Sequence, residues 1–233
     1  MKKMNFFFVV MLLLVIFINS SINAQYYEAL KKSAHDYLIS LSDSNSSSLS
    51  HFLNLKYNLF NSVDKKTLSK TFQISENELD SSRSNFYEFE TAIKNISKDS
   101  ALLLFNYWYL HFSNLFYNYA DEKCFSSETA KIILFSTSMS CACTLEMARN
   151  QTLDLLKFQK EITDDYNNEN EKPFIWIIDS YEHNELQIRY ETLFAPSVIV
   201  LDRNNELIWK IEYEDDMIEH LSQYINNNLY RNN

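Results

Sequence analysis

The chain has no glycine among its 233 residues, and this constrains its turns more than any other feature of the sequence. Glycine adopts a left-handed backbone at no steric cost, so tight turns must here be built from residues that carry a side chain. Asparagine tolerates that conformation better than most of them. We therefore expect turns at residues 167–168 and 204–205, where two asparagines stand together.

The first 24 residues have the pattern of a secretory signal peptide. Lys2 and Lys3 precede an uninterrupted apolar run over residues 6–18, and small and polar residues follow as far as Ala24. This run is shorter than the ~20 residues that a membrane span needs, which favours cleavage after Ala24 over a permanent anchor. We expect a periplasmic or secreted protein that has no stable membrane span after cleavage of the signal peptide.

The charge of the chain argues against nucleic-acid binding. The formal net charge is −10, and the first 24 residues contain two lysines and no acidic residue, so their removal changes it to −12. A surface this acidic repels the phosphates of DNA and RNA, and no basic cluster offsets the repulsion. We therefore expect no nucleic-acid partner.

Residues 25–122 carry the pattern of a helical region. Apolar side chains recur at helical spacing, and Ser75 with Glu78 forms a capping-box signature at the start of one helix. A later helix over residues 102–119 is rich in aromatic side chains, which are more typical of a core than of a ligand site, and the pair at residues 99–100 is a candidate cap for it. His111 within this helix has no ligand partner at metal spacing.

From about residue 128 short apolar runs replace the helical pattern. They are typical of buried strands and lie at residues 131–135, 174–178, 197–201 and 206–211. Helices are expected at residues 144–162, 182–193 and 215–225. The predicted fold class is α/β, with one α/β domain over residues 123–233 preceded by the α-helical region.

Two cysteines separated by one residue, Cys141 and Cys143, follow the first predicted strand and precede a predicted helix. The N-terminus of a helix lowers the pKa of a nearby thiol, and a thiolate can attack a disulfide through a mixed intermediate. Cys141 is the better candidate nucleophile, whereas we expect Cys143 to be more buried and to resolve the intermediate. A disulfide between residues this close would be strained and easy to reduce.

The stretch IILFSTSMSCAC before a helix, the segment Ala195-Pro196-Ser197 and the terminal hairpin with its helix resemble the thioredoxin-like superfamily. The closest resemblance is to exported thiol–disulfide oxidoreductases of the TlpA/ResA type, over about residues 130–228. It implies a thioredoxin-like fold, catalytic Cys141 and Cys143, and a cis Pro196 beside the sulfurs, with no cofactor. The implied partners are protein thiols or disulfides in the cell envelope and a redox partner protein.

The motif departs from the family pattern in three ways. At the usual Cys-x-x-Cys spacing, the first cysteine would fall on Ser140 and the second on Cys143. Met139 stands where the family usually has tryptophan, and Leu134 where thioredoxin has an acidic residue. The active pair is therefore either Ser140 with Cys143 or Cys141 with Cys143.

Two other functions remain open at this motif. A sulfur set suited to Cu(I) would make the protein a metallochaperone, and its members are Met139, Cys141, Cys143 and Met147. A redox-inactive binding module is the other alternative, because Ser140 occupies the expected position of the nucleophile. A third cysteine, Cys124, either stays unpaired or bridges to Cys141 or Cys143.

Overall fold

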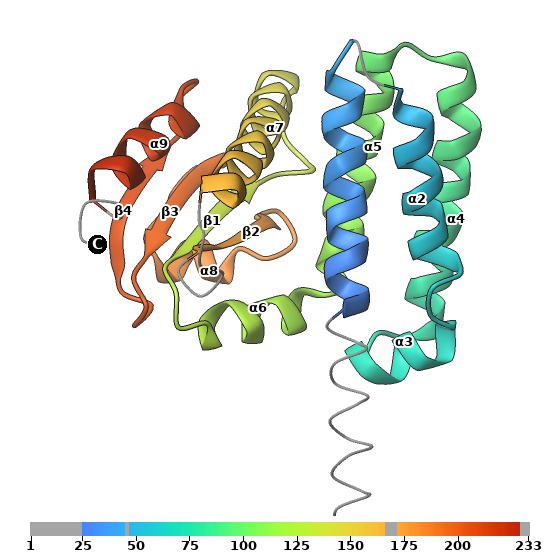
Figure 1. The fold of residues 1–233 in the computed structure, drawn as a ribbon, viewed down its shortest axis with the longest axis horizontal. Helices are drawn as coiled ribbons and strands as arrows, with labels where there is room; N and C mark the ends of the chain where they lie inside the picture. Colours follow the sequence, from blue (N-terminus) through green and yellow to red (C-terminus); the bar gives the residue numbers. More distant parts are fainter. Residues whose placement is uncertain (1–24, 45–46, 166–171, 229–233) are drawn as a thin grey trace, which may run out of the picture.

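The computed structural model of the chain describes residues 25–44, 47–165 and 172–228 (Figure 1). The predicted signal peptide over residues 1–24 and the predicted turn at residues 167–168 lie outside these ranges. The described residues form a helical N-terminal region and a mixed four-stranded sheet with helices packed on it. The α/β class and the helical N-terminal region predicted from the sequence are confirmed.

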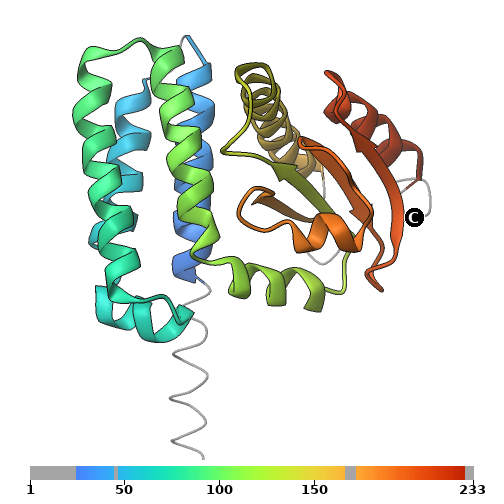
Figure 2. The same cartoon turned by 180° about the vertical axis from the view of Figure 1, so that it is seen from behind.

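Long helices standing side by side make up most of the N-terminal region, and shorter helices run across them at one end (Figures 1 and 2). A first helix spans residues 25–42. It is followed by α2 (Ser48–Phe60), α3 (Lys65–Phe72), α4 (Glu76–Ala92), a 3-10 turn (Ile93–Asn95), α5 (Lys98–Asn114) and α6 (Tyr117–Ser126). None of the helices within the described ranges is long and apolar enough to cross a membrane.

Side-chain caps fix where α3, α4 and α5 begin; that of α3 is Asp64, whose carboxylate accepts from the Thr67 N–H. The Ser75 hydroxyl accepts a hydrogen bond from the Glu78 N–H, and the Glu78 carboxylate accepts one from the Ser75 N–H, so the predicted capping box of α4 is confirmed. The cap of α5 is Ser97, whose hydroxyl accepts from the Ser100 N–H. The prediction that residues 99–100 cap this helix is wrong, because the backbone is already helical from Lys98.

Aromatic rings fill the core of the helical region. The ring of Phe105 lies 4.7 Å from that of Tyr37, edge to face, and 5.3 Å from that of Trp108. Such contacts add to the stabilisation that comes from burying the rings. The predicted core role of the aromatic segment is confirmed by four buried side chains, Phe105, Trp108, Phe112 and Phe116, and by Leu115, which is partly buried against the core. The prediction of one helix over residues 102–119 is wrong, because the segment divides between α5 and α6 at residues 115–116.

The sheet has the order β2-β1-β3-β4. Its strands are β1 (Lys131–Ser136), β2 (Phe174–Asp179), β3 (Ser197–Leu201) and β4 (Leu207–Glu212). β1 pairs in parallel with β2, while β3 is antiparallel to both β1 and β4. The helices of this part are α7 (Ala142–Asp165), α8 (Glu185–Arg189) and α9 (Met217–Asn228). All four predicted strands agree with the structure to within one residue.

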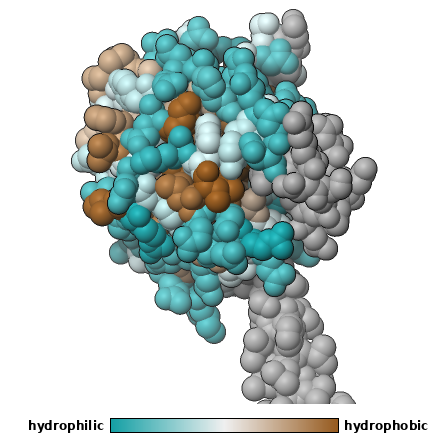
Figure 3. Space-filling view, turned by 90° about the vertical axis from the view of Figure 1, so that its left-hand side faces the viewer, coloured by the Kyte–Doolittle hydropathy of each residue, from teal (hydrophilic) through white to brown (hydrophobic). Residues whose placement is uncertain are grey.

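β4 is an outer strand and is only partly covered. Its Leu207 and Ile208 are 38% and 41% exposed, whereas all of β3 is buried. Trp209 stacks on Tyr224 of α9 with the ring centroids 5.4 Å apart, which packs the strand against that helix. On this side of the molecule hydrophobic side chains gather within a mostly hydrophilic face (Figure 3).

Four described residues have a left-handed backbone, and all of them carry a side chain because the sequence contains no glycine. They are Gln73, Glu191, Asn205 and Tyr213, with φ between 53° and 68°. Asn205 confirms the turn predicted after β3. At the other three positions the chain uses residues for which this conformation is costly. Among the four left-handed residues of the described ranges, one is an asparagine. Glu191 also explains why α8 ends before residue 193, since a left-handed residue ends a helix; α8 also begins three residues later than predicted.

The helical region packs against β2 and the turn that follows it. His111 of α5 lies 3.4 Å from the Glu182 carboxylate, and Tyr117 of α6 stacks on His183 with the ring centroids 3.8 Å apart. Buried side chains of both parts form one continuous hydrophobic cluster. α6 runs across residue 122, and the division of the chain there into two domains stays a prediction.

Candidate functional site: a thiol pair at the start of α7

The two cysteines lie where β1 gives way to α7. The carbonyl oxygen of Cys141 accepts the N–H of Leu145 at 3.0 Å, so Cys141 is the residue that caps the helix. Ala142 and Cys143 belong to the first turn. α7 therefore begins two residues earlier than predicted, and Cys143 lies within it.

Both thiols are free and exposed, and their sulfur atoms are 2.8 Å apart. Cys143 is therefore not buried in the first turn, and that it is the more buried of the two stays a prediction. The buried face of α7 carries Thr144, Ala148 and Thr152, which follow one another at helical spacing. Cys143 lies beside this face, so its side chain reaches solvent.

Hydrogen bonds lower the pKa of the Cys141 thiol from 9.0 to about 6. The largest cause is the side-chain contact with Cys143, followed by the hydroxyl and then the N–H of Thr144, while the N–H of Cys143 adds a smaller effect. Each of these groups stabilises the negative charge of a thiolate. At neutral pH Cys141 is therefore mostly ionised, which is the reactive form of a cysteine.

A chain of contacts connects Cys141 to Pro196. The Thr144 hydroxyl lies 3.2 Å from the Cys141 sulfur and 2.8 Å from the Tyr213 phenol oxygen. The N–H of Tyr213 donates to the Pro196 carbonyl oxygen at 3.0 Å. The Ala195–Pro196 peptide bond is cis, as the resemblance implied. The structure thus brings Cys141 and Cys143 into contact and joins them to Pro196 through two further side chains.

A pocket of about 710 Å³ opens beside the cysteine loop. Its walls come from the β1–α7 loop, the turn after β2, the loop before β3 and the end of β4. Exposed apolar side chains contribute much of the lining: Met139, Tyr181, Leu193, Phe194 and Tyr213. Such side chains suit contacts with a polypeptide partner.

Two carboxylates hold the loops around this pocket. The buried Asp179 accepts the N–H groups of Ser138 and Tyr181, both at 3.1 Å. Glu212 accepts the N–H groups of residues 193–194, at 2.7 and 3.2 Å. Asp179 therefore joins the cysteine loop to the turn after β2, and Glu212 holds the loop that leads to Pro196.

Sequence reasoning missed four residues that shape the site: Thr144, Asp179, Glu212 and Tyr213. A signal for Asp179 was present, because a polar residue directly after an apolar strand marks the edge where loops meet. Thr144 had one as well, since it lies three residues after Cys141 at the start of a predicted helix. Glu212 and Tyr213 had none, because their partners are distant in the sequence; Thr144 and Tyr213, for example, are 69 residues apart.

Cys124 lies away from the thiol pair. It is fully buried, and burial raises its pKa to about 12. The charged groups that act on it most are Lys131, the first residue of β1, and Lys31. Cys141 follows the other end of this strand, which is about 20 Å long. Of the two alternatives for Cys124, the structure shows the unpaired thiol.

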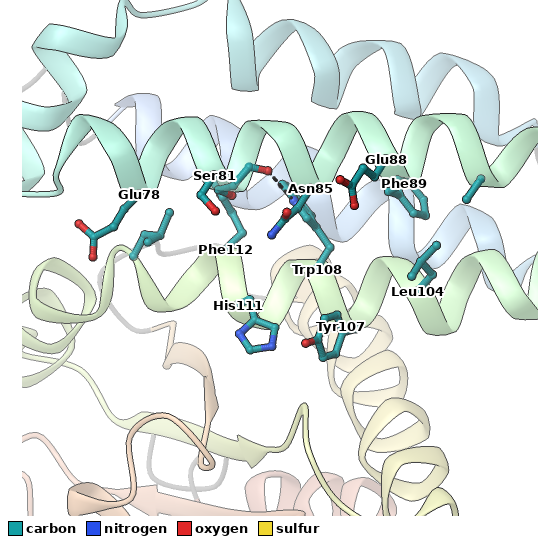
Figure 4. A pocket seen from close by; sticks show the side chains of 13 residues that line it. Glu78, Ser81, Asn85, Glu88, Phe89, Leu104, Tyr107, Trp108, His111 and Phe112 are labelled. Carbon is teal, nitrogen blue, oxygen red and sulfur yellow. Dashed lines mark hydrogen bonds between the residues drawn. The ribbon is translucent and has the colours of Figure 1, made fainter.

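Two further places that could attract a ligand contain no cysteine. A pocket of about 530 Å³ lies between α4 and α5, where Glu88 and Asn85 face Trp108 and His111 (Figure 4). At the start of α9 a group of exposed side chains places its possible metal-ligand atoms within 4.8 Å of one another: Glu214, Asp216 and His220. The Cu(I) set suggested by the sequence stays a prediction. Its Met139 is exposed and lines the pocket beside the cysteine loop.

Comparisons with known proteins do not place the chain in a family. No family model and no curated protein matches it. One solved structure, described as the crystal structure of a designed protein, is similar over 47% of this chain and 84% of that chain, with 13% identity and a TM-score of 0.32. A similarity this weak carries no argument about fold or activity.

Proposed function

We propose that the C-terminal part of the chain is a thioredoxin-like domain that catalyses thiol–disulfide exchange at Cys141 and Cys143. The observation that carries this proposal is an exposed thiol with a pKa lowered to about 6, in contact with a second exposed thiol at the start of a helix. The strand order β2-β1-β3-β4, with β3 antiparallel to its neighbours, supports the thioredoxin-like assignment.

The exchange begins when the Cys141 thiolate attacks one sulfur of a protein disulfide. The substrate S–S bond breaks, its second sulfur leaves as a thiolate, and Cys141 is held in a mixed disulfide. Cys143 then gives its proton to solvent and attacks the Cys141 sulfur, which releases the rest of the substrate as a thiolate. The substrate has gained two electrons and the enzyme holds a Cys141–Cys143 disulfide, which a partner protein dithiol reduces for the next cycle.

The surroundings of the thiols support a protein substrate. The pocket beside them offers exposed apolar side chains from three separate loops and from the end of β4, and Pro196 follows one of these loops. If the predicted signal peptide is used, the substrates are thiols and disulfides of the cell envelope or of secreted proteins. Pro196 would then shape the contact between the substrate backbone and the cysteine loop.

Mass spectrometry after alkylation tests the proposal. The reduced protein is treated with a model disulfide peptide, and the remaining thiols are then blocked and counted. We expect wild type to lose two reactive thiols at Cys141 and Cys143, whereas Cys143→Ser should accumulate a mixed disulfide at Cys141. Cys141→Ser should be inactive, and Cys124→Ser, the matched control, should behave as wild type. The proposal is refuted if Cys141 joins neither Cys143 nor the peptide.

A further inference from the structure

Two hydroxyl groups connect the Cys141 sulfur to the far wall of the pocket, and the exchange described above gives the second of them, the Tyr213 phenol, no role. Thr144 is buried, at 7% exposure, in the first turn of α7. Its hydroxyl oxygen lies 3.2 Å from the Cys141 sulfur and 2.8 Å from the phenol oxygen of Tyr213. Tyr213 follows the last residue of β4 and has a left-handed backbone with φ of 53°.

The charge on sulfur decides the direction of these hydrogen bonds. A thiolate has no proton and can only accept, so the Thr144 hydroxyl must donate to ionised Cys141. The lone pairs of the Thr144 oxygen are then free to accept the Tyr213 phenol proton. When Cys141 is held in a disulfide its sulfur carries no charge and accepts weakly, and Thr144 can donate to Tyr213 instead.

We propose that Thr144 and Tyr213 are positioning residues for exchange at Cys141, in which the Tyr213 phenol orients the Thr144 hydroxyl and that hydroxyl donates to the thiolate. This inference rests on the proposed function for the importance of the thiolate. The backbone of Tyr213 is itself fixed, because its N–H donates to the Pro196 carbonyl oxygen. Consecutive hydrogen bonds thus connect the Cys141 sulfur, the two hydroxyls and the Pro196 carbonyl.

The loss of one hydroxyl should change the pKa of Cys141 measurably, because only a few neutral groups lower that pKa. Every group that lowers the pKa of Cys141 is a neutral donor on Cys143 or Thr144. The charged side chains on the adjoining elements have partners of their own. Glu146 lies 3.9 Å from Arg149 on α7, Glu212 holds residues 193–194, and Glu214 lies 4.0 Å from His220. No cation is among the groups that act on the pKa of Cys141, so none compensates there for the loss of a hydroxyl.

Three variants of the full chain test the inference: Thr144→Val, Thr144→Ser and Tyr213→Phe. The readout is the rate at which iodoacetamide modifies Cys141, located by peptide mass spectrometry, as a function of pH. Near pH 6, the pKa of the wild-type thiol, we expect Thr144→Val to react about three- to tenfold more slowly. At about pH 10, where every variant is ionised, the rates should converge. Thr144→Ser should keep the wild-type profile, and Tyr213→Phe should shift it in the same direction as Thr144→Val.

The outcomes separate this inference from the proposed function. A Thr144→Val profile equal to wild type overturns the inference, as does an equal loss at both pH values, which would indicate a purely structural disturbance. Should Thr144→Val fail to fold, the exposed Tyr213→Phe substitution decides in its place. Alkylation needs no disulfide substrate, so an active exchange enzyme with an unshifted profile refutes only the role of the hydroxyls. A shifted profile in a protein without exchange activity refutes only the proposed function.

Discussion

Gln73→Gly should increase the free energy of unfolding by about 0.5–1 kcal/mol. Gln73 ends α3 with φ of 56° and ψ of 31°, and its side chain is exposed, so the substitution removes no packing. A left-handed backbone costs a residue with a Cβ atom about 1–2 kcal/mol, a cost that glycine lacks. Glycine also destabilises the folded state by about 0.5–1 kcal/mol, because the unfolded chain has more conformational freedom with glycine at this position. The difference between these two effects is the expected gain.

Thermal and urea unfolding followed by circular dichroism measures this gain. For a chain of this size it corresponds to an increase in Tm of about 1–4 °C. Lys70→Gly is the matched control, because Lys70 lies in the same helix with a right-handed backbone, and the substitution should cost about 1 kcal/mol. Gln73→Ala keeps the Cβ atom and should change little. If glycine destabilises position 73 as much as position 70, the left-handed cost assigned to Gln73 is wrong.

Three further predictions concern the thiols and a helix cap. Cys143→Ala removes the largest cause of the lowered pKa of Cys141, so this pKa should rise above about 6. Alkylation of Cys141 at neutral pH should then slow about tenfold. An unchanged midpoint in the pH–rate profile would contradict this prediction. Ser75→Ala should cost about 1 kcal/mol of stability in urea unfolding, because the N-terminus of α4 loses its capping box, and a loss below about 0.3 kcal/mol would argue against that role. Cys124, whose pKa burial raises to about 12, should resist maleimide under native conditions and react once urea unfolds the chain, as counted by intact mass.

The strands could be predicted from the sequence because each is a short apolar run. All six residues of β1 and all five of β3 are buried, as are five of the six residues of β2. A strand covered on both faces needs such a run, and polar residues at its ends mark where it stops. The C-terminal end of α8 was predicted too late because nothing local shows that Glu191 takes a left-handed backbone.

The site could be predicted only as far as local spacing reaches. Cys141 and Cys143 are close because one residue separates them, and the strand before them places them at a helix N-terminus. The exposure of Cys143 depends on where α7 begins, since a shift of two residues turns the side chain by more than half a turn around the helix. The contact between Thr144 and Tyr213 depends on how β4 ends beside α7, which no local pattern specifies.

The turn after β2 serves two parts of the molecule at once. Its Glu182 and His183 contact α5 and α6, while Ser180 and Tyr181 line the pocket beside the cysteine loop. A movement of these helices against the sheet would therefore reach the pocket across a single peptide unit. Any partner whose affinity differed between two positions of the helices would be thermodynamically linked to a polypeptide bound at the pocket, and each would alter the affinity of the other by the same factor.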